Sequence, residues 1–185
     1  ALPIYTAIDD DLLSFFADRL KVHLRDDGVR HDHIEAVIEQ QSDGDLVELV
    51  ARVRALGDFL QSDDGTNLLV AYRRAANIVR AEEKKDSADY DGAAYDPGLS
   101  GAEKIESALW DVLTRTESEI ETALADEAFE SAMKSLAGLR QPIDAFFDEV
   151  TVNVDDSAVR GNRLRLLARI QGVMNNVADF SKVEG

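Results

Sequence analysis

The sequence predicts an all-α fold, a helical bundle of seven to eight mostly antiparallel helices, from three observations. Ala, Leu, Glu, Asp and Arg are abundant, whereas aromatic residues make up 6% of the chain and proline occurs three times, which is typical of helices and not of strands. Apolar residues recur at steps of three and four in almost every segment. Capping signals and glycine or proline stops leave only short connections between most of these segments, which favours antiparallel neighbours.

The first half of the chain should form four helices. Leu13, Phe16, Leu20 and Leu24 share one helical face, and the next helix, through Ile34 to Ile38, should be capped by Asp32. A third helix is expected from about 45 to 61. Thr66 should cap the fourth, which continues to about 85.

The second half begins after an interruption. Between about 86 and 99 the sequence is acidic, rich in small residues and broken by proline, so we expect an exposed, flexible loop there. A capping-box pattern at Ser100 to Glu103 should open a long helix, and another is expected from about 126 to 137. Pro142 suits the first turn of a short helix that ends at Val150, and the last helix should run from about 157 to 180.

Composition limits the class of protein further. A chain of 185 residues with 45% hydrophobic content can bury one core, so we expect a single domain over residues 1–185. The absence of cysteine excludes disulfides and thiolate metal sites and agrees with a reducing compartment. Apolar runs are too short for a membrane span, and no signal peptide is visible, so we expect a cytoplasmic protein without a membrane partner. Because the first residue is Ala1, we expect a piece of a longer chain.

No group of residues indicates catalysis. His31 and His33 are two residues apart, so on a helix they point about 200° apart and cannot hold a metal together; both should be solvated residues of a first turn. The carboxylates of 117–121 and 126–127 are typical of a solvated helix face. A phosphate-binding glycine loop and a nucleophile elbow are both absent from the sequence, so we expect no catalytic residue, no metal and no cofactor site.

Positive charge is nevertheless segregated in a chain of net charge −17. Residues 66–85 contain five bases and two acids, whereas residues 101–150 contain four bases and twelve acids. Arg73, Asn77 and Arg80 follow each other at helical steps and form one polar stripe that Lys84 extends.

The last helix carries a second group of bases: Arg160, Arg163, Arg165 and Arg169. Arg165 and Arg169, with Asn162, should project opposite the apolar stripe and face solvent or phosphate. Arg160 and Arg163 should lie near that stripe, where they can pair with a carboxylate such as Asp144 or Asp148, or line a groove. Two functions therefore remain open: a module that binds an anionic partner, and a helical protein-interaction module whose arginines are paired internally.

A family resemblance adds to these observations. Residues 142–150 (PIDAFFDEV) and 154–167 (VDDSAVRGNRLRLL) resemble the C-terminus of the bacterial glycyl-tRNA synthetase beta subunit. Further likeness at 15–20, 34–37 and 71–78 extends it over essentially the whole chain. That region is similar to the all-helical anticodon-binding domain of arginyl-tRNA synthetase, known as DALR.

The resemblance implies a DALR-like domain that binds the anticodon region of glycine tRNA within a glycine-tRNA ligase. It also implies that ATP, Mg and glycine are used on a separate catalytic alpha subunit, and that the rest of the beta subunit is a further partner. Anticodon loops offer unstacked bases and phosphates to Arg and Asn side chains. The residues that match the family, with Arg165 and Arg169 added for their expected facing, are the RNA-binding candidates Arg73, Asn77, Arg80, Arg160, Asn162, Arg163, Arg165 and Arg169. The resemblance assigns no role to the acidic loop.

Overall fold

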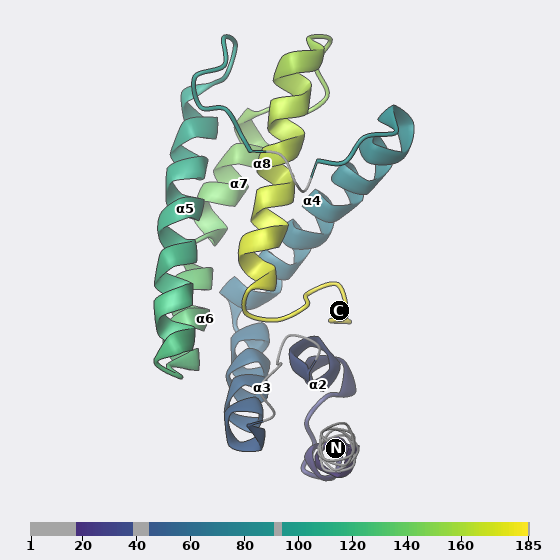
Figure 1. Cartoon of the computed structure of the whole chain (residues 1–185), viewed down its shortest axis with the longest axis vertical. Coiled ribbons are helices and arrows are strands. Elements are labelled where there is room, and N and C mark those ends of the chain that lie inside the picture. Colours follow the sequence, from purple (N-terminus) through teal and green to yellow (C-terminus); the bar gives the residue numbers. More distant parts are fainter. Residues whose placement is uncertain (1–17, 39–44, 91–93, 185) are drawn as a thin grey trace, which may run out of the picture.

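A computed structural model describes residues 18–38, 45–90 and 94–184 and confirms the all-α fold (Figure 1). Within these ranges no residue lies in a β-strand, and residues 18–26 are helical. The helices with complete bounds are α2 (His31–Ile38), α3 (Leu46–Gln61), α4 (Asp63–Asp86), α5 (Lys104–Ala125), α6 (Phe129–Ala137), α7 (Arg140–Glu149) and α8 (Ser157–Asn175).

Helix α8 lies at the centre of the bundle, where it packs against α4 on one side and α5 on the other (Figure 1). Ten of its side chains are buried, although its sequence suggested a single apolar stripe. Near one end of the pair Arg160 contacts Glu82, and near the other end the Tyr72 hydroxyl donates to Asn175 Oδ1 at 3.2 Å. Helices α4 and α8 therefore run in opposite directions.

The chain after α8 does not continue as a helix to residue 180. The last turn ends at Asn175, and residues 176–184 turn back toward α2 and α3 (Figure 1). Arg52 of α3 donates to the carbonyl oxygens of Val177 and Asn176 at 2.7 and 2.8 Å, and Asp179 N donates to Ala36 O at 2.7 Å. These long-range bonds end the helix because they use backbone groups that a further turn would need.

Helix starts follow local hydrogen bonds and differ in part from the expectation. Helix α3 starts close to the expected residue 45, and Asp45 caps it by accepting from Val47 N and Glu48 N. The cap of α4 is Ser62 and not Thr66, since Ser62 Oγ accepts from Gly65 N at 3.0 Å. Helix α5 starts at Lys104, where Glu103 N donates to Glu106 Oε1 at 3.0 Å. The capping box therefore lies at Glu103, three residues after the predicted position at Ser100.

Two further boundaries also moved. Helix α6 starts at Phe129 and not near 126, because Glu127 has a left-handed backbone with a φ of 53°. Helix α7 starts at Arg140, so Pro142 lies in its first turn as expected.

Part of the connection between α4 and α5 is buried, which corrects the expectation of an exposed loop. Tyr90 and Tyr95 are buried, and the Tyr95 ring lies 5.4 Å from that of Trp110 between centroids. Aromatic side chains in an otherwise polar loop bury large apolar surfaces and fix the chain where they dock.

Candidate nucleic-acid interface

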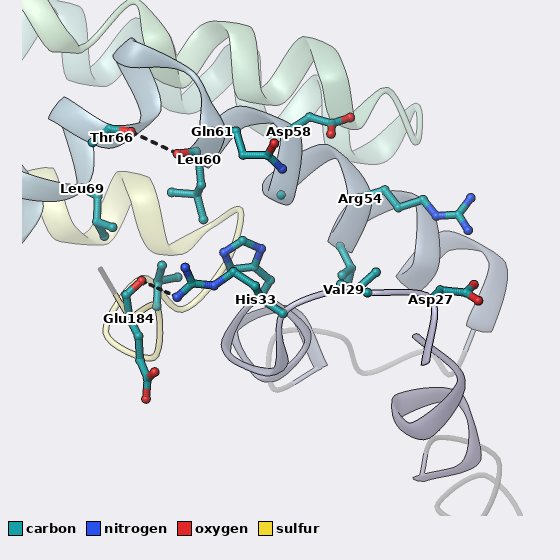
Figure 2. A pocket seen from close by; sticks show the side chains of 15 residues that line it. Asp27, Val29, His33, Arg54, Asp58, Leu60, Gln61, Thr66, Leu69 and Glu184 are labelled. Carbon is teal, nitrogen blue, oxygen red and sulfur yellow. Dashed lines mark hydrogen bonds between the residues drawn. The ribbon is translucent and has the colours of Figure 1, made fainter. Parts of the chain in front are cut away.

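A cavity of about 540 Å³ lies between α2, α3, the start of α4 and the C-terminal segment (Figure 2). His33 lines it and is only 6% exposed, and Asp32 is 8% exposed, so the prediction of solvated histidines in this turn was wrong for His33, whereas His31 is exposed as predicted. Asp32 is not a helix cap. Its carboxylate accepts from Nε and Nη2 of Arg30, at 3.0 and 2.7 Å, and from Glu184 N at 2.7 Å. The returning C-terminal segment, which no local pattern reveals, covers these residues.

The pKa values of His33 and Asp32 in this turn are both shifted from their ordinary values. Burial lowers the pKa of His33, against the opposing effect of the Asp32 charge. The pKa of Asp32 is about 2, because the bonds from Arg30 and from Glu184 N, with the nearby positive charges, outweigh the burial that would raise it.

We expect the chain to become less stable as the pH falls from about 7 toward 5, because unfolded His33, with its ordinary pKa of 6.5, takes up a proton that the folded state excludes. One proton gives a slope of at most about 1.4 kcal/mol per pH unit. Urea unfolding of His33→Gln at several pH values should show a flatter dependence than the parent. His31→Gln, at an exposed position of the same helix, is the matched control; an unchanged slope in His33→Gln would contradict the assignment.

No group of three or more potential ligands among His, Asp and Glu gathers within the described ranges in a geometry that could hold a metal ion. None of the helices in the same ranges combines the length and apolar content needed to cross a bilayer.

The exposed face of α4 carries the first group of predicted RNA-binding residues. Asn77 and Arg80 are exposed, as are the neighbouring Arg74 and Lys84. Arg73 is half-buried, and its guanidinium donates to the carbonyl oxygen of Val183 at 2.7 Å. Among the residues that the structure describes, Arg80 has no carboxylate partner, so its charge faces solvent.

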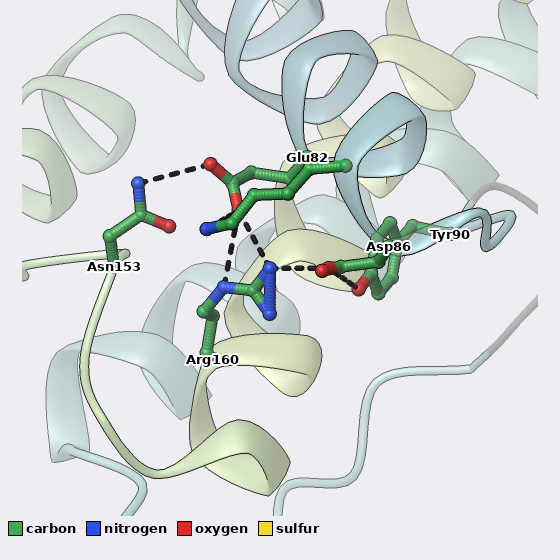
Figure 3. Close-up of polar contacts among 6 residues, drawn as sticks. Glu82, Asp86, Tyr90, Asn153 and Arg160 are labelled. Carbon is green, nitrogen blue, oxygen red and sulfur yellow. Dashed lines mark hydrogen bonds and ion pairs between the residues drawn. The ribbon is translucent and has the colours of Figure 1, made fainter.

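Arg160 lies in an ionic cluster between α8 and α4 (Figure 3). It donates to Glu82 Oε2 at 2.6 and 3.2 Å and also contacts Asp86, which accepts from the Tyr90 hydroxyl at 2.7 Å. Its side chain is 14% exposed. Asn153 donates to the other oxygen of Glu82 at 3.3 Å, so four segments are joined at this point.

Asn162 and Arg163 are also engaged inside the fold. Asn162 is fully buried and exchanges two hydrogen bonds with the backbone of Asp96, at 2.8 and 2.9 Å. The guanidinium of Arg163, at 3% exposure, donates to Glu106 at 2.9 Å, Glu103 at 2.7 Å and Thr151 O at 2.7 Å.

The expected facing of Asn162 was wrong, whereas the expected pairing of Arg160 and Arg163 with carboxylates is confirmed with different partners. Asn162 does not project outward, because the segment from 94 to 99 crosses that side of α8. Arg160 and Arg163 do pair with carboxylates, but not with Asp144 or Asp148, because the acids that face them come from α4 and from the start of α5.

Arg165 and Arg169 are half-buried and not fully outward, because α8 is enclosed on two sides. Arg169 pairs with Glu117, and its guanidinium carbon lies 5.6 Å from the Trp110 ring centroid. The Nε atoms of both arginines are buried without a hydrogen-bond partner in the described part of the chain. Like Arg73, Arg74 and Arg80, Arg165 has no carboxylate partner there.

Helices α4 and α8 lie side by side, but their candidate cations face different neighbours: Arg169 pairs with Glu117 and lies near Trp110 of α5, whereas Arg73 reaches Val183. Contacts from Glu82 to Arg160 and from Tyr72 to Asn175 bracket the segment, so α4 between 73 and 80 runs beside α8 between 165 and 175. Besides Arg160, which the ionic cluster engages, five of the eight candidates keep at least partial exposure: Arg73, Asn77, Arg80, Arg165 and Arg169. Whether any of the eight contacts RNA stays a prediction.

Sequence reasoning missed one polar contact beside this surface. The guanidinium of Arg74 lies over the ring of Phe147, with 4.1 Å from its carbon to the ring centroid. The doublet Phe146–Phe147 on a short helix could have indicated it, because two adjacent helical residues point in different directions and one of the two rings is left outside the core. Phe146 is fully buried, and Phe147 remains partly exposed.

The chain belongs to the DALR anticodon binding domain family, whose model matches residues 68–184, from α4 to the C-terminal segment. Among curated proteins it is similar to the glycine–tRNA ligase beta subunit of Rhodospirillum centenum, with 56% identity over 179 residues. That alignment covers 96% of this chain and 25% of the relative. The beta subunits of Phenylobacterium zucineum and Ruegeria sp. are each 49% identical, over 100% and 95% of this chain and 27% and 25% of their own lengths. The chain thus spans about a quarter of the length of these relatives.

Proposed function

We propose that this chain is the anticodon-binding domain of a glycine–tRNA ligase beta subunit and that it binds the anticodon stem and loop of glycine tRNA. One observation carries the proposal: in a chain of the DALR family with net charge −17, α4 exposes Arg74, Arg80 and Lys84, and none of the three has a carboxylate partner in the described ranges. An acidic protein that approaches RNA needs such a local reversal of charge, because phosphate contacts supply most of the affinity.

In this proposal the domain binds RNA and performs no chemistry. ATP, Mg and glycine are used by a separate alpha subunit of a cytoplasmic ligase, and this domain positions the tRNA for it. The relatives are named beta subunits of a glycine–tRNA ligase, which supports such a ligase as the setting of this domain. Arg80 and Arg165 are the strongest candidates for phosphate or base contact, since neither has a carboxylate partner in the described ranges. Arg160, Asn162 and Arg163 would instead stabilise the fold beside this surface, since their side-chain N–H groups already donate hydrogen bonds within the chain.

The alternative function, a protein-interaction module with internally paired arginines, is favoured by a specific observation. Arg160, Arg163 and Arg169 each pair with a carboxylate. The unpaired Arg80 and Arg165 argue against it.

A gel-shift titration against glycine tRNA, and against the same tRNA with its anticodon replaced, at two or more salt concentrations, tests the proposal. We expect the affinity to fall by about three to four powers of ten per tenfold rise in salt if about five phosphates of a single strand are contacted. The altered anticodon should bind more weakly at every salt concentration. Equal binding of the two RNAs would contradict anticodon recognition, and no binding of either would favour the protein-interaction module.

A further inference from the structure

A second cavity lies on the other flank of α4, beside α7 and the segment that joins α7 to α8. Its volume is about 350 Å³, and it is lined by Arg74, Ile78, Phe147 and residues 148–153. None of these residues belongs to the eight RNA-binding candidates. The cavity nevertheless adjoins the same exposed face of α4, because Arg74 is exposed and lies one helical turn from Asn77 and Ile78.

Arg74 and Phe147 form a stacking platform at this cavity. The cation lies over the aromatic ring at 4.1 Å, and Arg74 has no carboxylate partner within the described ranges. A planar guanidinium that rests on a ring can stack against a second flat group with its outer surface and can still donate hydrogen bonds from its edge. This arrangement suits an aromatic ligand next to an anion.

The charges around the cavity indicate how such a ligand would lie. Asp148 and Glu149 belong to the lining, which disfavours a phosphate inside. Arg74, Arg80 and Lys84 are exposed along α4 and favour a phosphate outside. Asn153, held by its bond to Glu82, places a side-chain amide at the lining, where it can bind a base edge.

We propose that this cavity binds one unstacked base of single-stranded RNA, with the base on the Arg74 guanidinium, Phe147 beneath it, and the adjoining phosphate toward the α4 cations. The proposal rests on the RNA-binding function above and adds a base subsite to it. Base stacking on such a platform tolerates any base, so the subsite contributes affinity and leaves discrimination to base-edge contacts such as Asn153.

The test separates stacking from charge by measuring tRNA affinity in the assembled ligase by filter binding. Arg74→Lys keeps the charge and removes the plane, and Phe147→Leu keeps an apolar side chain and removes the ring. We expect each to weaken glycine tRNA binding about ten- to fiftyfold, the effect of losing one stacked base, with an unchanged salt dependence. Arg115→Lys, at an exposed site on α5, is the matched control and should bind as the parent does.

The outcomes distinguish failure of the base subsite from failure of the proposed tRNA binding. If Arg74→Lys and Phe147→Leu both bind as tightly as the parent while Arg80→Gln binds more weakly, the subsite is overturned and RNA binding stands. If the parent itself does not bind tRNA, the proposed function fails as well. Should Phe147→Leu lower the melting temperature, the exposed Arg74→Lys alone decides the result.

Discussion

Replacing Arg163 by Met should destabilise the chain by about 3–5 kcal/mol, because it leaves the carboxylate of Glu106 buried without its counter-charge. Glu106 has no exposed surface, and one of its oxygens, Oε2, has no hydrogen-bond partner among the described residues. Its counter-charge is the Arg163 guanidinium, which contacts Oε1 through Nε at 2.9 Å and through Nη2 at 2.8 Å; the uncharged Glu103 N–H is a further donor to the same oxygen. The carbonyl of Thr151 would lose a donor at the same time.

Urea unfolding of the 185-residue chain measures this loss. Arg165→Met, two residues away on the same helix and half-buried without a carboxylate partner in the described ranges, is the control and should cost less than about 1 kcal/mol. Adding Glu106→Leu to Arg163→Met should restore part of the stability, since the uncompensated charge is then removed. A loss below about 1 kcal/mol for Arg163→Met would show that the buried pair of Arg163 and Glu106 is not required for the stability of the chain.

Removing the four arginines at partly exposed or exposed candidate positions should lower the affinity for glycine tRNA by about 10²- to 10³-fold near 0.1 M salt. The variant changes Arg73, Arg80, Arg165 and Arg169 to Gln. Each lost contact to a single-stranded phosphate removes about 0.7 from the slope of log affinity against log salt, so the dependence should become nearly flat. Filter binding at four salt concentrations measures both quantities.

The matched variant removes the same number of charges elsewhere. Arg54, Lys104, Arg115 and Lys134 are exposed on α3, α5 and α6, and changing these four to Gln alters the net charge equally. This variant should keep most of the salt slope. Equal losses in the two variants would mean that only the overall charge matters and that α4 and α8 form no localised site.

The helices could be predicted from sequence because their signals are local. The spacing of Leu49, Val53 and Leu56 on α3, and the cap at Asp45, depend on residues within a few positions of one another. The end of α8 was wrong because a distant segment intervened: after Asn175, Arg52 binds the backbone. His33 was misjudged for the same reason, since the C-terminal segment covers the turn that carries it. The starts of α4, α5 and α6 were misplaced for local reasons, the caps at Ser62 and Glu103 and the left-handed backbone of Glu127.

The sequence by itself determined the helical class, the lack of a recognisable catalytic motif and the segregation of positive charge toward α4 and α8. The tertiary structure decided which of those cations are available to a partner. A helical pattern assigns one apolar side, but α8 is packed from two sides, so Arg160, Asn162 and Arg163 are engaged internally while Arg80 remains free on the edge of the bundle. The physical reason is that the number of neighbours around a helix, and therefore the facing of its polar side chains, is set by contacts between residues far apart in the sequence.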